Sequence, residues 1–215
     1  MTLPDHLREV LAEGTAATWE AIAALLPAKA YLVGGTALAI HLRRRISRDL
    51  DFYLEEPVDL DALVRALQLR GAFLPTMRED ASPQTLNGVF EATKLQFLEA
   101  SSQLLLEEPA LVAGVRVAGI ADLLATKLNV ITHRPALRDY VDLMMIEQQG
   151  HRFVEEGLAL FLEKNRPAVP DQALRLVIEC LASFDDVEAD PELQFLSARA
   201  VTKAAVARYW TERDL

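Results

Sequence analysis

The stretch Tyr31–Leu54, YLVGGTALAIHLRRRISRDLDFYL, predicts a strand, a glycine turn, a helix and a second strand in direct succession. Tyr31–Val33 is a short apolar run, and Gly34–Thr36 interrupts it. Residues 37–44 then contain helix formers without proline or glycine. This order of elements predicts an α/β fold organised around a glycine turn that leads into a helix.

The second strand of this stretch, residues 47–54, alternates between apolar and polar side chains. Successive side chains of a strand point to opposite faces of the sheet. One face consists of Leu50, Phe52 and Leu54, and the other carries Ser47, Asp49, Asp51 and Tyr53. Two carboxylates therefore project in the same direction from a strand whose opposite face belongs to the core.

This pair of carboxylates predicts a site for a divalent cation, because neighbouring negative charges repel unless a cation lies between them. Mg²⁺ is usually bound by one or two carboxylates plus substrate phosphates, and two such ions ~3.5–4 Å apart can hold the attacking and leaving oxygens of a phosphoryl transfer. Glycines allow a close backbone approach, and N–H groups at a helix start attract anions. Asp49 and Asp51 are the candidate metal ligands, and Gly34, Gly35 and Thr36 the candidate phosphate ligands.

Each half of this pattern also has a simpler interpretation. A glycine pair alone is most often just a turn, and an Asp-x-Asp on an exposed strand face is more often solvated than bound to a metal. The two together, with a core face behind the acids, favour a nucleoside triphosphate site over both simpler interpretations.

Composition describes a globular protein of 215 residues, with 51% hydrophobic and 25% charged residues. No run of 18 apolar residues occurs, and the start of the chain lacks a signal-peptide pattern, so we expect a cytoplasmic protein without a membrane span. The single cysteine, Cys180, excludes an intramolecular disulfide and a zinc site of several cysteines. A net charge of −10 argues against a protein that coats nucleic acid.

Charge is nevertheless uneven along the chain, in two basic groups and one acidic group. They are His41, Arg43, Arg44, Arg45 and Arg48; Lys127, His133, Arg134 and Arg138; and Asp185, Asp186, Glu188, Asp190 and Glu192. A basic pocket on an acidic body suits a focused polyanion site, such as a triphosphate or one end of an RNA. The alternative is an ordinary solvated helix face with ion pairs four residues apart.

Hydrophobic periodicity extends the fold prediction to the whole chain. Helices are expected at 5–26, from Asp59 or Asp61 to 69, and at 119–132, 136–147, 153–162, 171–184 and 193–209; strands are expected between 73 and 98, with a hairpin turn at Asn87-Gly88, and at 115–117. We therefore predict a small mixed sheet flanked by helices in residues 1–118. A helical domain in residues 119–215 is expected to complete the active-site cleft.

Lys127 lies on the apolar stripe of the helix predicted at 119–132, with apolar neighbours three and four residues away on both sides. Desolvating a lysine is costly unless its charge meets a partner, so a lysine aimed into a pocket to hold phosphate is one interpretation. The other is a lysine whose stem packs at the edge of the stripe while its ammonium reaches water. Arg138 and Asp142, further on, have the spacing of a simple helical ion pair.

Gly34-Gly35-Thr36, twelve residues and then Asp49-Leu50-Asp51-Phe52 resemble the signature of the nucleotidyltransferase superfamily. The run Arg45-Ile46-Ser47-Arg48-Asp49-Leu50-Asp51-Phe52 is more specific and resembles the AbiEii/AbiGii toxin family. The runs Asp122–Lys127, His133-Arg134 and Arg138–Leu143 resemble that family's later motifs. Together these matches cover roughly residues 30–145.

The resemblance implies a nucleotidyltransferase-like fold and a Mg²⁺-dependent active site with two ions and an NTP substrate. It implies catalytic residues Asp49, Asp51, Lys127, Asp139 and Asp142, and nucleotide-binding residues Gly34, Gly35, Thr36, Arg45, Ser47 and Lys127. The superfamily usually has a third carboxylate on a neighbouring strand, and Gln96 stands at the matching position. Glu99 is close in sequence but is expected to point away from the side that Gln96 faces.

The resemblance further implies the toxin of a bacterial toxin–antitoxin pair, with a cognate antitoxin protein as partner and RNA, namely the 3′ end of tRNA, as acceptor. Two alternatives stay open. The acceptor hydroxyl could belong to a small molecule or a partner protein, or the chain could be an NTP-binding module in which Gln96 has impaired catalysis.

Overall fold

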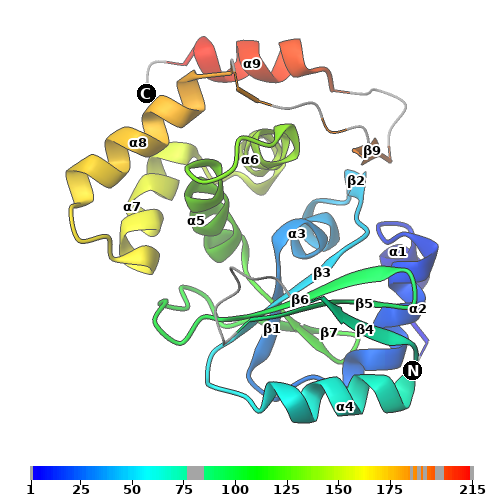
Figure 1. Ribbon diagram of the computed structural model, residues 1–215. Coiled ribbons are helices and arrows are strands. Elements are labelled where there is room, and N and C mark those ends of the chain that lie inside the picture. The colour runs from blue at the N-terminus through cyan, green and yellow to red at the C-terminus, as the bar shows by residue number, and fades with distance from the viewer. Residues whose placement is uncertain are drawn as a thin grey trace. The chain divides into compact units, whose positions relative to one another are not determined.

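The computed structural model describes residues 2–76, 85–184, 186–187, 190, 193–196 and 201–213 (Figure 1). The chain divides into two compact units, each described by itself. The first consists of residues 1–102 and 108–118, and the second of residues 103–107 and 119–215. A short segment, 103–107, thus belongs to the second unit although the chain returns to the first unit directly after it.

The first unit is built on a mixed sheet that, among the described residues, has seven strands in the order β4-β5-β6-β3-β1-β8-β7. The strands are β1 (Ala30–Val33), β3 (Leu50–Leu54), β4 (Phe73–Thr76), β5 (Thr85–Phe90), β6 (Thr93–Glu99), β7 (Ala110–Val112) and β8 (Val115–Val117). β3 runs antiparallel to β1 and parallel to β6, and β8 runs parallel to β1. The predicted α/β class with a mixed sheet is confirmed.

The apolar face predicted for residues 47–54 is the buried face of β3. Leu50, Phe52 and Leu54 are each at most 2% exposed. The ring of Phe52 stacks on that of Phe97 in β6, with centroids 5.1 Å apart. Because this side of β3 is held in the core, the side chain of Asp51 must project from the opposite face of the sheet.

The helices of the first unit are α1 (Asp5–Arg8), α2 (Glu13–Ile22), the 3₁₀ turn η1 (Ala23–Leu25), α3 (Gly34–Leu42) and α4 (Leu60–Arg70), and the short strand β2 spans Arg45–Ile46. The single helix predicted over 5–26 is wrong, because the helix is interrupted at Val10–Ala12. There the amide of Ser47 donates to the carbonyl of Val10, and the amide of Ala12 donates to the carbonyl of Ser47, each at 2.9 Å. The loop before β3, which carries Asp49, is thereby fastened to the N-terminal segment.

The hairpin turn predicted at Asn87-Gly88 is also wrong, since both residues lie within β5. A Cβ atom at Gly88 would overlap the ring of Phe73 on the neighbouring strand β4, so close packing accounts for this glycine. The turn instead falls at Glu91, whose φ is 53°, between the paired ends Phe90 and Thr93. The sequence signal indicated a hairpin in the right region but placed it on the wrong dipeptide.

The second unit consists, in its described residues, of α5 (Ile120–Ile131), α6 (Leu137–Gly150), α7 (Val154–Asn165), α8 (Pro170–Ala182), α9 (Lys203–Thr211) and a two-residue strand, β9 (Gln194–Phe195). α5 to α8 lie where the sequence predicts them. The helix predicted over 193–209 is wrong at Gln194–Phe195, which form β9, and residues 197–200 lie outside the described residues. α9 begins after Thr202, whose hydroxyl caps it by accepting from the amide of Ala205 at 3.2 Å. Asp185, Glu188 and Glu192 of the predicted acidic group lie outside the described residues.

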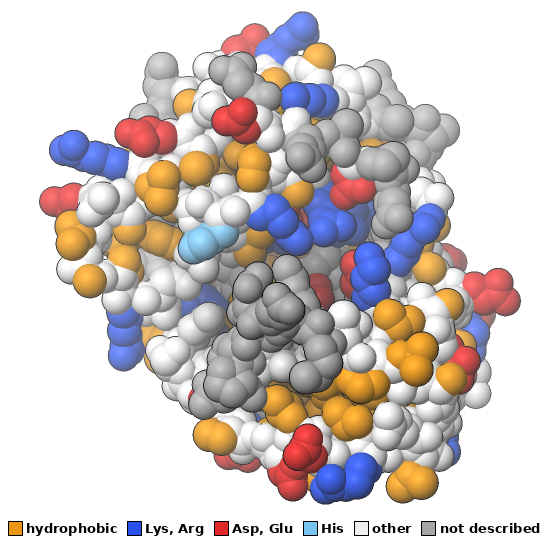
Figure 2. Space-filling view, in the orientation of Figure 1, with side chains coloured by type: hydrophobic (Ala, Val, Ile, Leu, Met, Phe, Trp, Pro, Cys, Tyr) orange, Lys and Arg blue, Asp and Glu red, His pale blue; other side chains and the backbone are white. Residues whose placement is uncertain are grey.

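Charged and apolar side chains are interspersed on the face of the protein drawn in Figure 2. The most exposed large apolar residues of the described part include Leu69, Leu74 and Leu111, which are 90%, 70% and 74% exposed. No helix in the described part of the chain is both long enough and apolar enough to span a bilayer.

Candidate functional site

Asp49 and Asp51, the two aspartates singled out from the sequence, meet at the start of β3. Asp51 is the second residue of the strand, and Asp49 directly precedes the strand. Asp51 pairs with Val33 of β1 on one side and with Gln96 of β6 on the other. Residues paired in register on neighbouring strands share a face of the sheet. Gln96 is therefore the side chain that β6 places next to Asp51, where the superfamily usually has a third carboxylate.

Gly34 has a conformation and a close neighbour that both require glycine. It opens α3 with a φ of +68°, in the left-handed region that side chains rarely adopt. A Cβ atom built there would lie 2.5 Å from Oδ2 of Asp51. The carboxylate of Asp51 thus reaches the backbone of the glycine turn, so the turn and this candidate metal ligand are in direct contact.

Gly35, the second glycine of the turn, lies against a different charged group. A Cβ atom at this position would lie less than 3.0 Å from Nη2 of Arg45 and 3.0 Å from its Cζ. Arg45 belongs to β2, and only 8% of its surface is exposed. The structure therefore places the guanidinium of Arg45 over the first turn of α3.

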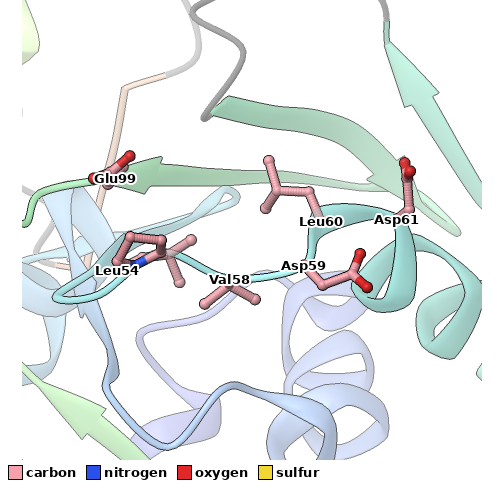
Figure 3. Close-up of a pocket in the computed structure, with 7 residues that line it drawn as sticks. Leu54, Val58, Asp59, Leu60, Asp61 and Glu99 are labelled. Atoms are coloured by element: carbon pink, nitrogen blue, oxygen red, sulfur yellow. The ribbon is translucent and has the colours of Figure 1, made fainter.

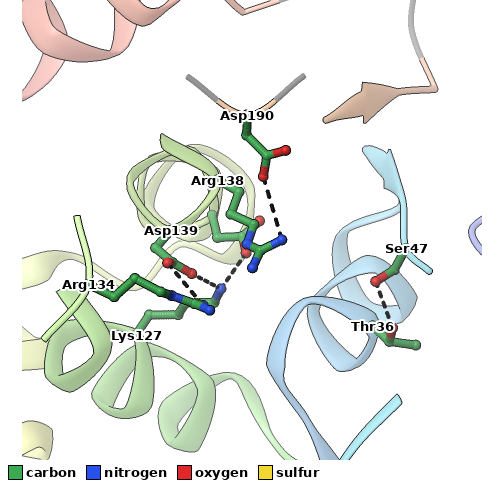
Figure 4. Close-up of polar contacts among 8 residues, drawn as sticks. Thr36, Ser47, Lys127, Arg134, Arg138, Asp139 and Asp190 are labelled. Atoms are coloured by element: carbon green, nitrogen blue, oxygen red, sulfur yellow. Dashed lines mark hydrogen bonds and ion pairs between the residues drawn. The ribbon is translucent and has the colours of Figure 1, made fainter. Parts of the chain in front are cut away.

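Thr36 and Ser47, both predicted to bind nucleotide, are buried and contact each other through their hydroxyls (Figure 4), and this chain of hydrogen bonds ends on Asp49. The hydroxyl of Thr36 donates to the backbone carbonyl of Asp49. A hydroxyl has one proton to donate, so the 2.6 Å contact between Thr36 and Ser47 must be donated by the hydroxyl of Ser47. In this arrangement the Thr36 hydroxyl is directed at the loop before β3 and fixes the backbone of a candidate metal ligand.

The donor set in this region suits a hard cation such as Mg²⁺, which takes oxygen ligands and retains water or substrate phosphates. The carboxylate of Asp51 lies beside Gly34, in the space that a side chain at this position would fill. The candidate ligands are the carboxylates of Asp49 and Asp51, and Gln96 offers an amide oxygen next to Asp51. Among the described residues no three His, Cys, Asp or Glu side chains cluster as a protein-only metal site would need, so phosphate or water oxygens would have to complete the coordination.

Lys127 of α5 and two aspartates of α6 form a second polar group, within the helical unit (Figure 4). Nζ of Lys127 lies 2.6 Å from Oδ1 of Asp139 and 2.7 Å from Oδ2 of Asp142. Lys127 is 6% exposed and both aspartates are fully buried. Arg134 adds a second cation at 3.4 Å from Oδ2 of Asp139, with its own side chain 55% exposed. A lysine whose ammonium reaches water does not agree with this burial, whereas the lysine that holds phosphate stays a prediction.

Around this group, Arg138 forms a 3.6 Å ion pair with Asp190. The exposed His133 contacts the carbonyl of Asn129 through Nδ1 at 2.9 Å. Another buried lysine of the same unit, Lys164, has a carboxylate partner, Asp122, that the sequence analysis included only as part of a motif. Lys164 follows Phe161 in an amphipathic helix without any motif around it, so no sequence signal distinguished it from a surface lysine.

A cavity of about 260 Å³ lies elsewhere in the first unit, where β3 and β6 end and α4 begins (Figure 3). Leu54, residues 57–61 and Glu99 line it. Glu99 shares the face of Phe97 and Leu95, opposite to that of Gln96, so it does point away from Asp51 as expected. The cavity therefore contains none of the predicted site residues.

Comparisons with known proteins bear on the family. A family model described as "Nucleotidyl transferase AbiEii toxin, Type IV TA system" matches residues 19–210. An uncharacterized protein of Aquifex aeolicus (strain VF5) is 27% identical over 164 residues, which are 74% of this chain and 76% of that protein.

One solved structure supports the fold. MenT4, a nucleotidyltransferase toxin from Mycobacterium tuberculosis H37Rv, superposes with a TM-score of 0.57 at 17% identity and covers 97% of this chain and 80% of its own. JHP933 from Helicobacter pylori matches with a TM-score of 0.39 at 14% identity, over 81% of this chain and 90% of its own. At such identities the MenT4 match supports the fold alone.

Proposed function

The chain belongs to the AbiEii family of nucleotidyltransferase toxins of type IV toxin–antitoxin systems, and from this premise we propose its reaction in detail. It transfers a nucleoside monophosphate from an NTP to a hydroxyl of RNA, with the 3′ end of tRNA as the acceptor. The observation that carries the proposal is the contact between Asp51 and the glycine turn, which brings a candidate metal ligand and a candidate phosphate-binding turn together.

In this reaction the acceptor oxygen forms a bond to the α-phosphorus while the bond from that phosphorus to the bridging oxygen breaks. Pyrophosphate leaves, and the proton of the acceptor hydroxyl passes to solvent. Mg²⁺ held by Asp49 and Asp51 supplies charge neutralisation on the phosphates when it is bound. Gln96 differs from the usual third carboxylate in having no charge, so this site offers the cation one negative charge fewer.

The remaining residues are proposed to orient the triphosphate and to neutralise it. The backbone N–H groups at the start of α3 and the guanidinium of Arg45 attract the β- and γ-phosphates. Thr36 and Ser47 contribute indirectly, because their hydroxyls fix the backbone of Asp49. Preorganised positive charge of this kind accounts for a large part of catalysis in phosphoryl transfer.

Lys127 is proposed to neutralise charge on the triphosphate, with Asp139 and Asp142 as the residues that orient it. An ammonium has three N–H donors, and the two carboxylates accept from it at 2.6 Å and 2.7 Å. The side chain is thereby held in one direction, which reduces the entropy lost when a phosphate binds.

A labelling experiment tests this function. The protein is incubated with total RNA, Mg²⁺ and each of the four α-labelled NTPs in turn, and we expect label on RNA of tRNA size from at least one of them. Asp49→Asn and Asp51→Asn should each abolish transfer, whereas Asp61→Asn, which changes an exposed aspartate of α4, should retain it. Absence of label from RNA, or label that survives the first two substitutions, contradicts the proposal. Label that travels with a protein or a small molecule supports the alternative acceptors instead.

The register of Gln96 with Asp51 favours one alternative, an NTP-binding module with impaired catalysis. In that case the protein binds NTP, but it releases no pyrophosphate above the level of Asp51→Asn. Gln96→Glu would raise the affinity for Mg²⁺ in either case, so only the release of pyrophosphate by the wild type distinguishes the two. If the wild type already transfers nucleotide faster than the Asp51→Asn variant, the impaired module is excluded.

A further inference from the structure

The two glycines of the turn have different reasons to be glycine. Gly34 has a positive φ, so a side chain would strain the backbone whatever lay around it. Gly35 is not among the glycines with positive φ, so its backbone conformation is open to any residue. The three atoms nearest to a Cβ at Gly35 are Nη2, Cζ and Nη1, all of the guanidinium of Arg45. The guanidinium of Arg45 therefore occupies the space that a side chain at position 35 would need.

The guanidinium of Arg45 lies in a position that suits a triphosphate-binding group. It lies over the first turn of α3, whose backbone N–H groups carry partial positive charge. Arg45 as a whole is only 8% exposed, so its planar fork is held in place rather than free to explore solvent. A held guanidinium loses less entropy on binding phosphate than an exposed one, and its paired N–H groups match two phosphate oxygens.

We infer that Gly35 is a positioning residue that acts through Arg45, and that Arg45 binds the β- and γ-phosphates of the NTP. The absence of a side chain at position 35 is what allows the guanidinium to lie against the start of α3. This assignment rests on the proposed nucleotidyltransfer, since it names the group that receives the triphosphate. It differs from the sequence-based expectation that Gly35 admits the phosphates themselves.

A double-mutant cycle tests the inference with Gly35→Ala, Arg45→Ala and the variant that carries both. Nucleotide transfer is measured as a function of NTP concentration. Arg45→Ala should raise the KM for NTP about 10- to 100-fold, as expected for the loss of one charge-assisted hydrogen bond. Gly35→Ala should raise it comparably, because the methyl group displaces the guanidinium. The double variant should be within about twofold of Arg45→Ala, because alanine at position 35 then has no guanidinium to displace.

Two further variants serve as controls. Gly14→Ala adds the same methyl group in α2, where its Cβ would lie 3.8 Å from the nearest atom, and it should leave both KM and kcat unchanged. Arg45→Lys keeps the charge but loses the fork, so it should recover part of the affinity that Arg45→Ala loses. A Gly35→Ala variant with wild-type KM overturns the inference, and so does a double variant whose KM increase is the product of the two single increases.

Thermal unfolding of the same four proteins separates this inference from the proposed function, because it needs no activity. The drop in Tm caused by Gly35→Ala should shrink in the Arg45→Ala background, and additive drops overturn the contact between the two residues. If the wild type transfers no nucleotide but the Tm changes are coupled, the reaction is wrong while the positioning role stands. If Gly35→Ala folds only when Arg45 is also alanine, the coupling is confirmed. If neither Gly35→Ala nor the double variant folds, the inference is wrong.

Discussion

Two buried lysines of the helical unit have the same kind of partner but different surroundings. Lys164 in α7 donates to Asp122 at 2.6 Å and to the backbone carbonyl of Leu104 at 3.1 Å. Asp122 in turn accepts from the amides of Leu106 and Glu107 at 3.1 Å and 2.9 Å. One cation is thus matched by one carboxylate, and both are used to hold the backbone of the segment 103–107. This is a structural arrangement.

Lys127 has two carboxylates instead of one, and its described contacts join side chains rather than backbone. Asp139 also contacts Arg134, which is more than half exposed, so this group extends from the interior to the surface. Two cations and two buried carboxylates within a few ångströms are costly to desolvate, and replacing such groups with apolar residues is often neutral or stabilising. From this difference we expect a lysine tied to backbone to have a structural role, and a lysine held by two carboxylates to have a chemical role.

The largest expected effect comes from Lys127→Met. It leaves two buried carboxylates without their shared cation, so the free energy of unfolding should fall by about 3–5 kcal/mol. Nucleotide transfer should also fall about 10²- to 10³-fold, as is typical when a preorganised charge is removed. Transfer is measured at a temperature where circular dichroism shows the variant to be folded. If Lys127→Met does not fold, Lys127→Arg is measured in its place. If the folded variant transfers nucleotide at the wild-type rate, Lys127 has only a structural role, as Lys164 does.

Lys164→Met should lower the free energy of unfolding without lowering nucleotide transfer. It leaves the carboxylate of Asp122 buried with amide donors but no cation, so a loss of about 3–5 kcal/mol in unfolding free energy is again expected. The folded fraction should retain the wild-type kcat and KM. Lys29→Met, at an exposed lysine, should change the unfolding free energy by less than about 0.5 kcal/mol. A drop in kcat for folded Lys164→Met would erase the distinction between the two lysines.

Thr36→Val tests whether a buried polar contact can serve both stability and chemistry. It removes the donor to the carbonyl of Asp49 and the acceptor of the Ser47 hydroxyl, so unfolding free energy should fall by about 1–3 kcal/mol. Small displacement of Asp49 should also lower the transfer rate about tenfold and raise the Mg²⁺ concentration for half-maximal rate. Thr36→Ser keeps the hydroxyl and should restore the Mg²⁺ response. An unchanged Mg²⁺ response in Thr36→Val assigns the contact to stability alone.

The smallest effect concerns pH and another buried carboxylate of structural type, Glu147. It accepts from the amide of Val154 at 2.7 Å and from the hydroxyl of Tyr209. Burial, together with this hydrogen bond and the charge of Glu147, raises the pKa of Tyr209 from 10.0 to about 12. The pKa of Tyr140 is raised to about 12 as well, chiefly by burial. The folded protein therefore holds both protons more tightly than the unfolded chain.

A raised pKa of this kind contributes stability that is fully present below pH 10 and is lost as pH rises toward 12. Tyr209→Phe should therefore lower stability slightly at pH 8, by about 1 kcal/mol, and flatten its decline between pH 10 and 12. Urea unfolding at a series of pH values measures both changes. A decline as steep as that of the wild type would mean that Tyr209 has no part in it.

Local periodicity and turn chemistry predicted much of the fold, and the residues show why. Leu50, Phe52 and Leu54 alternate strictly, and a one-residue shift would have exposed all three, so the strand and its buried face were determined locally. The break at Val10–Ala12 was not predictable, because it depends on pairing with Ser47, far away in sequence. The hairpin at Glu91 was missed because Asn87-Gly88 is the stronger turn signal, and only the ring of Phe73 explains why Gly88 lies within a strand.

For the candidate site, residue types were predictable but their partners were not. Asp49, Asp51 and Lys127 were identified by spacing and by resemblance to a family. That Thr36 bonds to the backbone of Asp49, or that Arg45 lies on Gly35, requires the path of the chain after α3, where Arg43 has a left-handed φ of 48°. Gln96, by contrast, was expected at the position of the third carboxylate, and the parallel pairing of β3 and β6 places it in register with Asp51.

The place of β8 in the first unit has a consequence for how the protein is made on the ribosome. β8 pairs with β1 through Val117 and Leu32. In sequence, however, residues 103–107, which belong to the helical unit, come before β7 and β8. A nascent polypeptide that has emerged only to residue 102 lacks this part of its sheet. Translation must proceed beyond residue 118 before β1 has its second neighbour, so we expect prematurely terminated products to be inert rather than smaller toxins.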